Sequence, residues 1–418
     1  MNNQNYLIGL FFLLLSTSVV GQNNGETYRS EYYAQLPFWE SPYQPFIGAI
    51  PITKEIASNR IHLKIDFDDQ NRITAAHVRL GKHYKEYEGR FGNLYINAPL
   101  TKVSYKAKKE THRFFDRFGN QINVQGNVYT KVYHKDEYGR NIKLTFLNKQ
   151  GEETLDQTSV KSYNWTHQND GSIVEERLGK DNSIVPLRGI FHLMRTRMVF
   201  DNQGRFKMLQ NIDDKGNIIN TDKGVAIYKY YYDNQGRFLR WEVYDKDGEK
   251  AIGPSNTAGE LVTFYEYNIE GIIFFDVKEN PAIHWSGAQR WHYELDDYGN
   301  RISLEFQTAD GKPMDANNGF SKNTWEWSKD GRYLLSAAFF DSKGNKIIHK
   351  AIGVHKAEYI RNNNGLIITK KYLDINGNLA NRIDSGAAME KITYDDNNLK
   401  RESLFYDKNG KEINTIKS

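Results

Sequence analysis

The sequence contains no cysteine, and this absence removes several classes of structure and chemistry. Disulfide bonds, thiolate nucleophiles and cysteine-ligated zinc are excluded, as is a lipid anchor on an N-terminal cysteine. Proline is also scarce, with 9 residues in 418, so the chain is not a proline-rich linker protein. A protein of this kind must be held together by its hydrophobic core and its backbone hydrogen bonds.

Charge of either sign is not in strong excess. There are 56 basic and 52 acidic residues, which give a formal net charge of +4 at neutral pH. The densest basic run extends only from Lys106 to Lys109, and the two signs are interspersed elsewhere. Nucleic-acid-binding proteins normally concentrate Lys and Arg on one face, so we expect no nucleic-acid partner.

Motifs for nucleophilic, phosphate and metal chemistry are also missing. The sequence has no G-x-S-x-G elbow, no phosphate-binding loop and no dinucleotide fingerprint. Its 11 His residues are scattered without the spacing of a zinc site. Acidic turns such as Asp213–Gly216 lack the staggered ligand series of a calcium loop. We therefore expect neither a metal nor a cofactor.

The N-terminus has the pattern of a signal peptide. Leu7 to Leu15 is an apolar stretch of the usual length, and small residues lead to a cleavage point after Gly21. The absence of Lys and Arg from residues 1–5 departs from that pattern. A membrane anchor is the alternative, but the polar segment 16–18 ends the apolar run before the ~20 residues that a spanning helix needs. We predict that residues 1–21 are a signal peptide.

An exported protein of this kind acts in the periplasm, at the cell surface or after secretion. No later segment is apolar enough to span a bilayer. We therefore expect no membrane span after the signal peptide is removed.

What the sequence does contain is a recurring turn. Asp-Asn-Gln-Gly-Arg-Phe at residues 201–206 returns unchanged at 233–238. Looser copies place Gly, or a residue that replaces it, at positions 71, 107, 139, 171, 204, 236, 271, 299, 331, 365 and 398. Asp at the first turn position accepts backbone hydrogen bonds, and Gly at the fourth adopts the left-handed conformation that closes a hairpin. We expect about eleven repeats of about 32 residues.

Between these turns apolar and polar residues alternate. In 238–244, Leu239, Trp241 and Val243 fall on one face of a strand, and the residues between them fall on the other. A second turn follows 12 or 13 residues after most first turns. We predict an all-β fold, a tandem array of β-hairpin or meander repeats of about three strands each, stacked as an elongated or curved solenoid-like sheet. The array is expected to span residues 61–418, with residues 22–60 as an N-terminal cap.

One copy of the motif resembles a known family. Tyr-Tyr-Tyr-Asp-Asn-Gln-Gly-Arg-Phe at residues 230–238 is similar to the YD repeat of Rhs-type proteins, whose pattern is Y-x-Y-D-x-x-G-R-[LF]. Looser copies extend the likeness from Asn71 to Gly410. The resemblance implies an exported or surface-associated β-repeat structure, of which some wrap into shells around a toxin. The longer period and the missing toxin domain depart from the family, and the resemblance implies no catalytic residues.

The clearest break in the repeat gives the candidate binding site. Gly271 and Gly299 are 28 residues apart, and Lys278–Pro281 stands where a second turn is expected. The candidate binding residues follow this break, namely His284, Trp285, Arg290, Trp291, His292 and Tyr293. If one strand runs through Gly287, alternation puts the two Trp and the Tyr on one face. The two His, the Arg and Glu294 then share the other face.

Two functions suit such a segment. Stacked aromatic rings beside charged groups suit sugar ligands, and a Tyr, His and Arg set suits β-elimination on an acidic polysaccharide. Packing of the Trp side chains in the core, beside a solvated charged face, is the structural alternative. Core packing is also the expectation for Trp325 and Trp327, which alternation puts on one face.

Our main hypothesis is therefore an exported β-repeat protein that presents an extended surface to a polysaccharide or a surface protein, with no catalytic residue assigned. The alternative hypothesis is an enzyme, a lyase or hydrolase of an extracellular polysaccharide, with its site in residues 271–299. A scaffold without a ligand is the third.

Overall fold

The structure is a computed structural model that describes residues 27–35, 40–43, 46, 48–86, 98–187 and 191–417. The predicted signal peptide, residues 1–21, lies outside the described residues, as does part of the predicted cap at 22–60. The boundaries between signal peptide, cap and array stay predictions.

The described part of the chain forms one antiparallel sheet of 26 strands. In chain order its elements are β1 (Arg29–Gln35), β2 (Ala49–Pro51), α1 (Lys54–Ala57), β3 (Ile61–Phe67), β4 (Ile73–Leu80), β5 (His83–Tyr84), β6 (Leu100–Lys106), β7 (Lys109–Phe115), β8 (Thr130–Lys135), β9 (Asn141–Leu147), β10 (Ser162–His167), β11 (Ile173–Leu178), β12 (Arg195–Phe200), β13 (Phe206–Ile212), β14 (Ile227–Tyr232), β15 (Phe238–Tyr244), β16 (Gly259–Tyr265), β17 (Asn268–Phe275), β18 (Arg290–Leu295), β19 (Arg301–Gln307), β20 (Lys322–Trp327), β21 (Leu334–Phe340), β22 (Lys356–Arg361), β23 (Ile367–Leu373), β24 (Met389–Tyr394), β25 (Lys400–Tyr406) and β26 (Glu412–Lys417). The prediction of an all-β array of hairpin repeats is confirmed.

The strands follow one another as a meander. From β7 to β25 each strand pairs with the strands before and after it in the chain. β6 pairs with β4 and β7, and β1 lies between β2 and β3. Pairing within a hairpin is long, as in the six residue pairs of β12 with β13. Pairing between hairpins is short, as in the three residue pairs of β13 with β14. Neighbouring hairpins therefore diverge toward their turns, and the sheet curves.

Each repeat contains two strands rather than the three that we expected. After the second turn the returning chain forms a single isolated bridge with the strand that it leaves, as in Ile212 with Ile218 and Tyr244 with Lys250. The residues that a third strand would need on β15, Arg240 to Glu242, already pair with β16 of the next hairpin. The return segment is therefore a loop at the edge of the array.

The turn motif has the conformation that its sequence predicts. In the copy at 233–238, Oδ1 of Asp233 accepts hydrogen bonds from the backbone amides of Gln235 and Arg237, both at 2.9 Å. Gly236 has a φ of 79°. The Arg237 guanidinium also donates to the Asp233 carboxylate, so Asp and Arg of the motif lock each other in place. The Asn that replaces Gly at position 398 has a φ of 64°, as expected for Asn in the left-handed region.

The predicted break in the repeat at 271–299 is wrong. Gly271 lies inside β17, and the hairpin turn falls earlier, at Glu266, which has a φ of 50° between the paired residues Tyr265 and Asn268. The turn has only two residues and lacks the Asp-x-x-Gly pattern. The prediction therefore took Gly271, the nearest glycine, as the turn residue, although it lies in the strand. The repeat therefore stays regular through this region.

The second turn of that repeat is also present. Asp276 accepts hydrogen bonds from the amides of Lys278 (2.8 Å) and Asn280 (2.9 Å). Glu279 replaces Gly at the fourth position and has a φ of 65°. Its carboxylate accepts hydrogen bonds from Arg240 (2.9 Å) and from Lys250 (2.5 Å) of the preceding repeat. These two bonds offset the cost of a non-glycine residue in the left-handed region.

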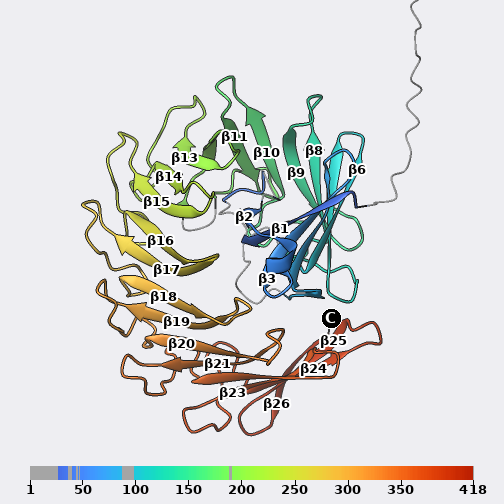
Figure 1. Cartoon of the computed structure of the whole chain (residues 1–418), viewed down its shortest axis with the longest axis vertical. Coiled ribbons are helices and arrows are strands. Elements are labelled where there is room, and N and C mark those ends of the chain that lie inside the picture. Colours follow the sequence, from blue (N-terminus) through green and yellow to red (C-terminus); the bar gives the residue numbers. More distant parts are fainter. Residues whose placement is uncertain are drawn as a thin grey trace, which may run out of the picture.

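The array curves until its C-terminal hairpins lie beside the N-terminal strands (Figure 1). Contacts between hairpin turns and the N-terminal part join the two ends. The amide of Ile61 donates to the carbonyl of Tyr298 (2.9 Å), and Nζ of Lys85 donates to the carbonyl of Gly331 (3.0 Å). Arg117 donates to the carbonyl of Asn364 (2.7 Å). Among the described residues no strand from β18 to β26 pairs with β1 to β5, so the sheet stays open.

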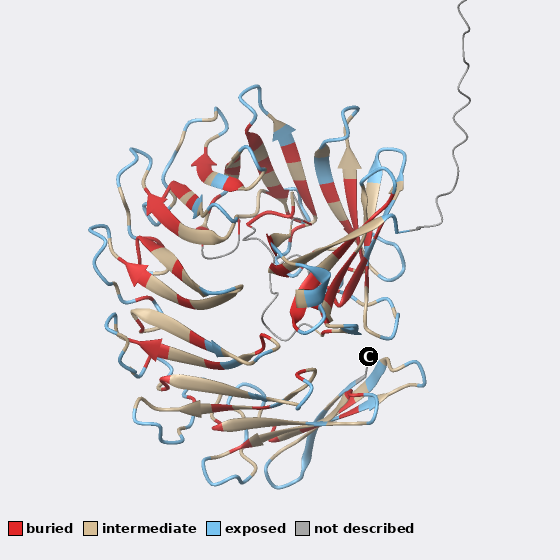
Figure 2. Cartoon of the chain, viewed as in Figure 1, coloured by how far each residue is buried: buried red, intermediate tan, exposed pale blue. Residues whose placement is uncertain are grey.

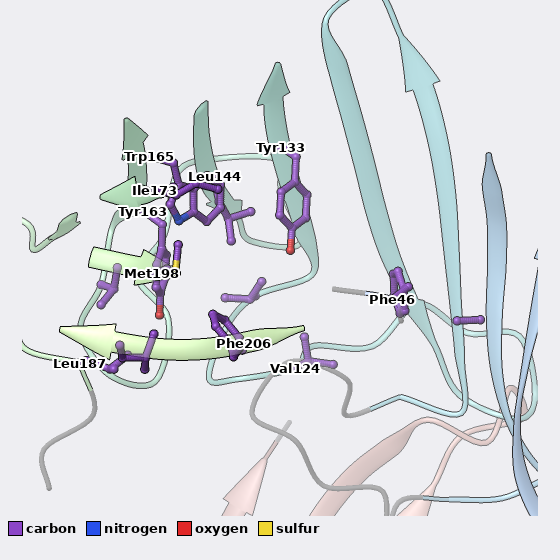
Figure 3. Close-up of a cluster of buried hydrophobic side chains, with 14 of the residues drawn as sticks. Phe46, Val124, Tyr133, Leu144, Tyr163, Trp165, Ile173, Leu187, Met198 and Phe206 are labelled. Carbon is purple, nitrogen blue, oxygen red and sulfur yellow. The ribbon is translucent and has the colours of Figure 1, made fainter. Parts of the chain in front are cut away.

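The two faces of the sheet differ in what covers them. We call the face that carries Tyr133 and Trp165 the inner face, and the opposite face the outer face. Residues 41–43 pack on the inner face, where the Tyr43 ring lies edge-on to Trp165 (5.3 Å) and the Tyr133 hydroxyl donates to the carbonyl of Pro42 (3.0 Å). Figure 3 shows Tyr133, Leu144 and Trp165 projecting from neighbouring strands into one cluster.

Burial decreases along the array. The main hydrophobic cluster draws its buried residues from Phe46 to Val243, whereas a smaller cluster farther along contains Ala288, Phe306, Ala316 and Phe320. Figure 2 shows that the C-terminal hairpins are largely intermediate or exposed. The second half of the sheet thus offers more side chains to solvent than the first half does.

Candidate functional site

Two of the six predicted site residues are packed together on the inner face. His284 is 3% exposed and its ring stacks on Phe274 with centroids 4.3 Å apart. Trp291 lies edge-on to His284 at 5.0 Å. The hydroxyl of Ser286 links them, since it lies 3.0 Å from Nδ1 of His284 and accepts a hydrogen bond from Nε1 of Trp291 (3.2 Å). Burial lowers the pKa of His284 to about 4, so this imidazole is neutral at physiological pH.

The predicted division of these residues between two faces is partly wrong. Gly287 has a φ of 96° and lies in a turn, and β18 begins only at Arg290. Alternation therefore cannot be followed from His284 through to Trp291. As a result His284 lies on the same side as Trp291, and Trp285 projects from the turn with 61% of its surface exposed.

The other three residues follow the alternation of β18. Arg290 and His292 lie opposite Gln307 and Glu305 on the outer face. Tyr293 lies on the inner face, is 6% exposed, and has its pKa raised by burial. The sheet thus separates His284 from His292 and Arg290. The described tryptophans also do not form an exposed row, because only Trp285 among them is largely exposed.

A hollow that the sequence did not reveal lies on the outer face of β20 to β23. Its volume is about 400 Å³, and its lining includes Thr324, Glu326, Ser336, Ala338, Phe340, Lys346, His355, Lys356, Glu358 and Leu373. A second hollow of about 260 Å³ shares Thr324 and Phe340 with it and reaches Glu305 on β19. Together they form one depression across five strands, which we call the outer groove.

Small side chains create the outer groove. β21 places Ser336, Ala338 and Phe340 on the outer face. The corresponding residues of β15 are Arg240 and Glu242, which fill the surface there with an ion-paired network. Ser and Ala leave that volume empty. The sequence does show small residues at alternate positions of 334–340. A groove, however, also depends on which side chains lie beside them on the two neighbouring strands, and the sequence alone does not give that pairing.

One end of the groove is rich in carboxylates. Ser336 pairs with Glu326 on one side and with Glu358 on the other, so the three side chains form a row across β20, β21 and β22. The Ser336 hydroxyl donates to Oε2 of Glu326 (3.0 Å). Lys356 donates to Oε1 of Glu358 (2.9 Å) and partly neutralises it.

The other end of the larger hollow is lined by Lys346, His355 and Phe340. His355 is 4% exposed, its Nδ1 lies 3.2 Å from the carbonyl oxygen of Ile347, and its ring lies edge-on to Phe340 at 5.5 Å. Burial lowers the pKa of His355, which keeps it neutral at physiological pH. The groove therefore combines hydroxyl, carboxylate, ammonium and imidazole groups with one aromatic ring.

The described residues contain no group of three or more His, Asp or Glu side chains that could hold a metal ion. In the same part of the chain no helix has the length and apolar character needed to cross a membrane, and α1 has only four residues.

Comparison with known proteins adds little to this picture. No protein-family model matches the chain, and no curated protein matches it. Among solved structures it is similar to the TcdB2-TccC3 structure, with 11% identity and a TM-score of 0.27 over 87% of this chain. The Photorhabdus luminescens Tc holotoxin pore gives 10% identity and a TM-score of 0.15 over 84% of this chain. The chain spans 24% and 23% of those two chains.

A structure described as the eukaryotic initiation factor gives 9% identity and a TM-score of 0.22, with 86% of this chain and 94% of that one covered. Likenesses at this level carry no argument about function. The molecule is a repeat-rich β protein, and its kinship with Rhs-type proteins remains a resemblance of local sequence.

Proposed function

We propose that this chain is an exported binding protein whose outer groove holds an extended, hydroxyl-rich ligand, an oligosaccharide segment of a polysaccharide. The observation that supports this proposal is the groove itself, a concave polar surface whose equivalent positions on β15 are filled by Arg240 and Glu242. Its lining mixes hydrogen-bond donors and acceptors with the ring of Phe340. Sugar ligands present that mixture of hydroxyl groups and apolar ring faces.

The dimensions of the groove favour a chain over a compact molecule. It crosses β19 to β23, which are four interstrand spacings, and these measure about 19 Å in all. Small-molecule pockets are more enclosed and mostly apolar. An elongated ligand can also lie along a rigid sheet without ordering any loop, which limits the entropy that binding costs.

Hydrolysis of the bound chain is the second candidate function. Glu326 and Glu358 face the same groove from two strands that flank β21, so their backbones are about 10 Å apart. Inverting glycosidases hold two carboxyl groups roughly 6.5–9.5 Å apart, a separation that these side chains can reach. The earlier hypothesis of a site at 271–299 lacks this support, because the sheet separates His284 from His292.

The test is a binding and cleavage assay on a panel of neutral and charged oligosaccharides. Calorimetry measures affinity, and chromatography of the same mixtures detects new reducing or unsaturated ends. Ala338→Glu should fill the groove and abolish binding. Thr145→Glu, at the equivalent position of β9 and outside the groove, is the matched control and should leave binding unchanged. No binding to any oligosaccharide, with both proteins folded, contradicts the proposal.

Export is tested separately. The full chain, produced in a bacterial host, should be recovered outside the cytoplasm with an N-terminus at residue 22. Recovery in the cytoplasm with Met1 retained contradicts this part of the proposal.

A further inference from the structure

We infer that the outer groove selects oligosaccharides that carry a free amino group, and that Glu326 is the residue that recognises it. This inference rests on the proposed function and specifies its ligand class. It follows from the distribution of paired and unpaired charges along the groove.

Glu326 is the carboxylate of the larger hollow that no cation neutralises among the described residues. It is exposed, and its one hydrogen bond among the described residues comes from the Ser336 hydroxyl. The other two carboxylates of the larger hollow already have partners. Glu358 pairs with Lys356 at 2.9 Å, and Oδ1 of Asp374 accepts the amides of Asn376 and Asn378, both at 2.9 Å.

The net charge of the groove points the same way. The linings of its two hollows contain five carboxylates (Glu305, Glu326, Asp341, Glu358 and Asp374) and three lysines (Lys322, Lys346 and Lys356), which sum to −2 while His355 is neutral. An acidic polysaccharide would meet uncompensated negative charge at Glu326. A ligand with an ammonium group would gain a charge-assisted hydrogen bond there. The hydroxyl of Ser336, next to Glu326 in the same row, can accept a second hydrogen bond from that ammonium group.

The remainder of the groove suits uncharged parts of the ligand. Lys346 lies at the opposite end and forms no ion pair among the described residues. Ser336 and Phe340 are four residues apart on β21, which is about 13 Å along the strand. An ammonium group at Glu326 therefore leaves Lys346 free to donate to a hydroxyl or amide oxygen of a distant sugar. This arrangement favours an oligosaccharide that carries an amino group over one that carries carboxylates.

The experiment compares three tetrasaccharide probes by calorimetry on the full chain at pH 6. The probes are a glucosamine tetramer, its fully N-acetylated form and a galacturonic acid tetramer. The glucosamine tetramer should bind about tenfold more tightly than the N-acetylated one, the ratio expected for one charge-assisted hydrogen bond. The galacturonic acid tetramer should bind least.

Two variants locate the effect. Glu326→Gln keeps the shape of the groove but removes the charge, so it should abolish the preference for the amino form. Glu137→Gln, in an exposed turn of another repeat, should alter neither. Equal binding of amino and N-acetylated probes, or an unchanged preference in Glu326→Gln, overturns the inference and leaves the proposed function standing. Failure of all three probes to bind overturns both.

Discussion

A methyl group added to Gly365 would lie 2.5 Å from the hydroxyl oxygen of Tyr333, a residue of the preceding repeat's turn. That hydroxyl accepts a hydrogen bond from Arg117 (2.8 Å), far away in the chain. Gly365 therefore serves two purposes. It supplies a φ of 75°, and its missing side chain lets neighbouring turns stack where the two ends of the array meet.

Substitution of Gly365 separates these two purposes when it is compared with a second glycine. Gly344 has a φ of 83° and no atom within 4 Å of an added Cβ. Gly344→Ala should cost about 1 kcal/mol from backbone strain. Gly365→Ala should cost about 3 kcal/mol, because the Tyr333 ring must also move and its bond to Arg117 is lost. Urea unfolding measures both, and equal losses would show that the stacking of turns adds no stability.

The Asp and Arg of the repeated motif also connect neighbouring hairpins. Arg205 is held by Asp201 (Nε to Oδ2, 2.7 Å), and its guanidinium lies 4.5 Å from the ring centroid of Tyr232 in the next repeat. Arg205→Lys keeps the charge but loses the planar fork and the stacking, so the free energy of unfolding should fall by about 1 kcal/mol.

Arg140 provides the control for that substitution. It makes the same fork with Asp136 but lies over Tyr138 of its own exposed turn, not over the next hairpin. Arg140→Lys should therefore leave the unfolding midpoint unchanged. If Arg140→Lys lowered the free energy of unfolding as much as Arg205→Lys does, the Asp–Arg pair within the turn would account for the effect and the contact between repeats would not.

These turns show what sequence can predict here. Asp201–Gly204 and Asp233–Gly236 were placed correctly because local hydrogen bonds and a left-handed glycine suffice to define them. Gly271 was misplaced because a glycine also occurs in strands, and the real turn at Glu266 has no glycine. The outer groove was missed because it needs Glu326, Ser336 and Glu358 side by side, and only the register of three strands brings them together.

A buried ion pair ties the N-terminal segment to the array. The Glu175 carboxylate, 0% exposed, accepts hydrogen bonds from Arg177 (2.5 Å), the Trp165 indole (2.9 Å) and the Ser41 hydroxyl. Glu175→Gln removes the charge that neutralises the buried Arg177 and should destabilise the protein by about 3 kcal/mol. Thermal and urea unfolding measure the loss. Replacing exposed Glu137 with Gln should leave the free energy of unfolding unchanged. Equal stability of the Glu175→Gln and Glu137→Gln variants would contradict the stabilising role of this buried ion pair.

Acid should destabilise the protein partly through His284. Its pKa is near 6.5 when unfolded and is lowered to about 4 by burial in the folded state. Below pH 6.5 the unfolded chain therefore binds a proton that the folded chain does not, so stability falls as pH decreases from 6.5 toward 4. His284→Phe keeps an aromatic ring on Phe274 and should show a smaller decrease between pH 7 and pH 5. An unchanged pH dependence in His284→Phe would contradict this assignment.

We expect ligand to bind in the outer groove and not at the segment 284–293. Hydroxyl-radical footprinting with mass spectrometry, with and without the glucosamine tetramer, distinguishes these surfaces in one experiment. Phe340 marks the groove, and Trp285, 61% exposed, marks the other segment. A ligand in the outer groove should protect the peptides that cover 334–358 and leave the oxidation of Trp285 unchanged. Protection of Trp285 with no change at Phe340 would contradict this expectation.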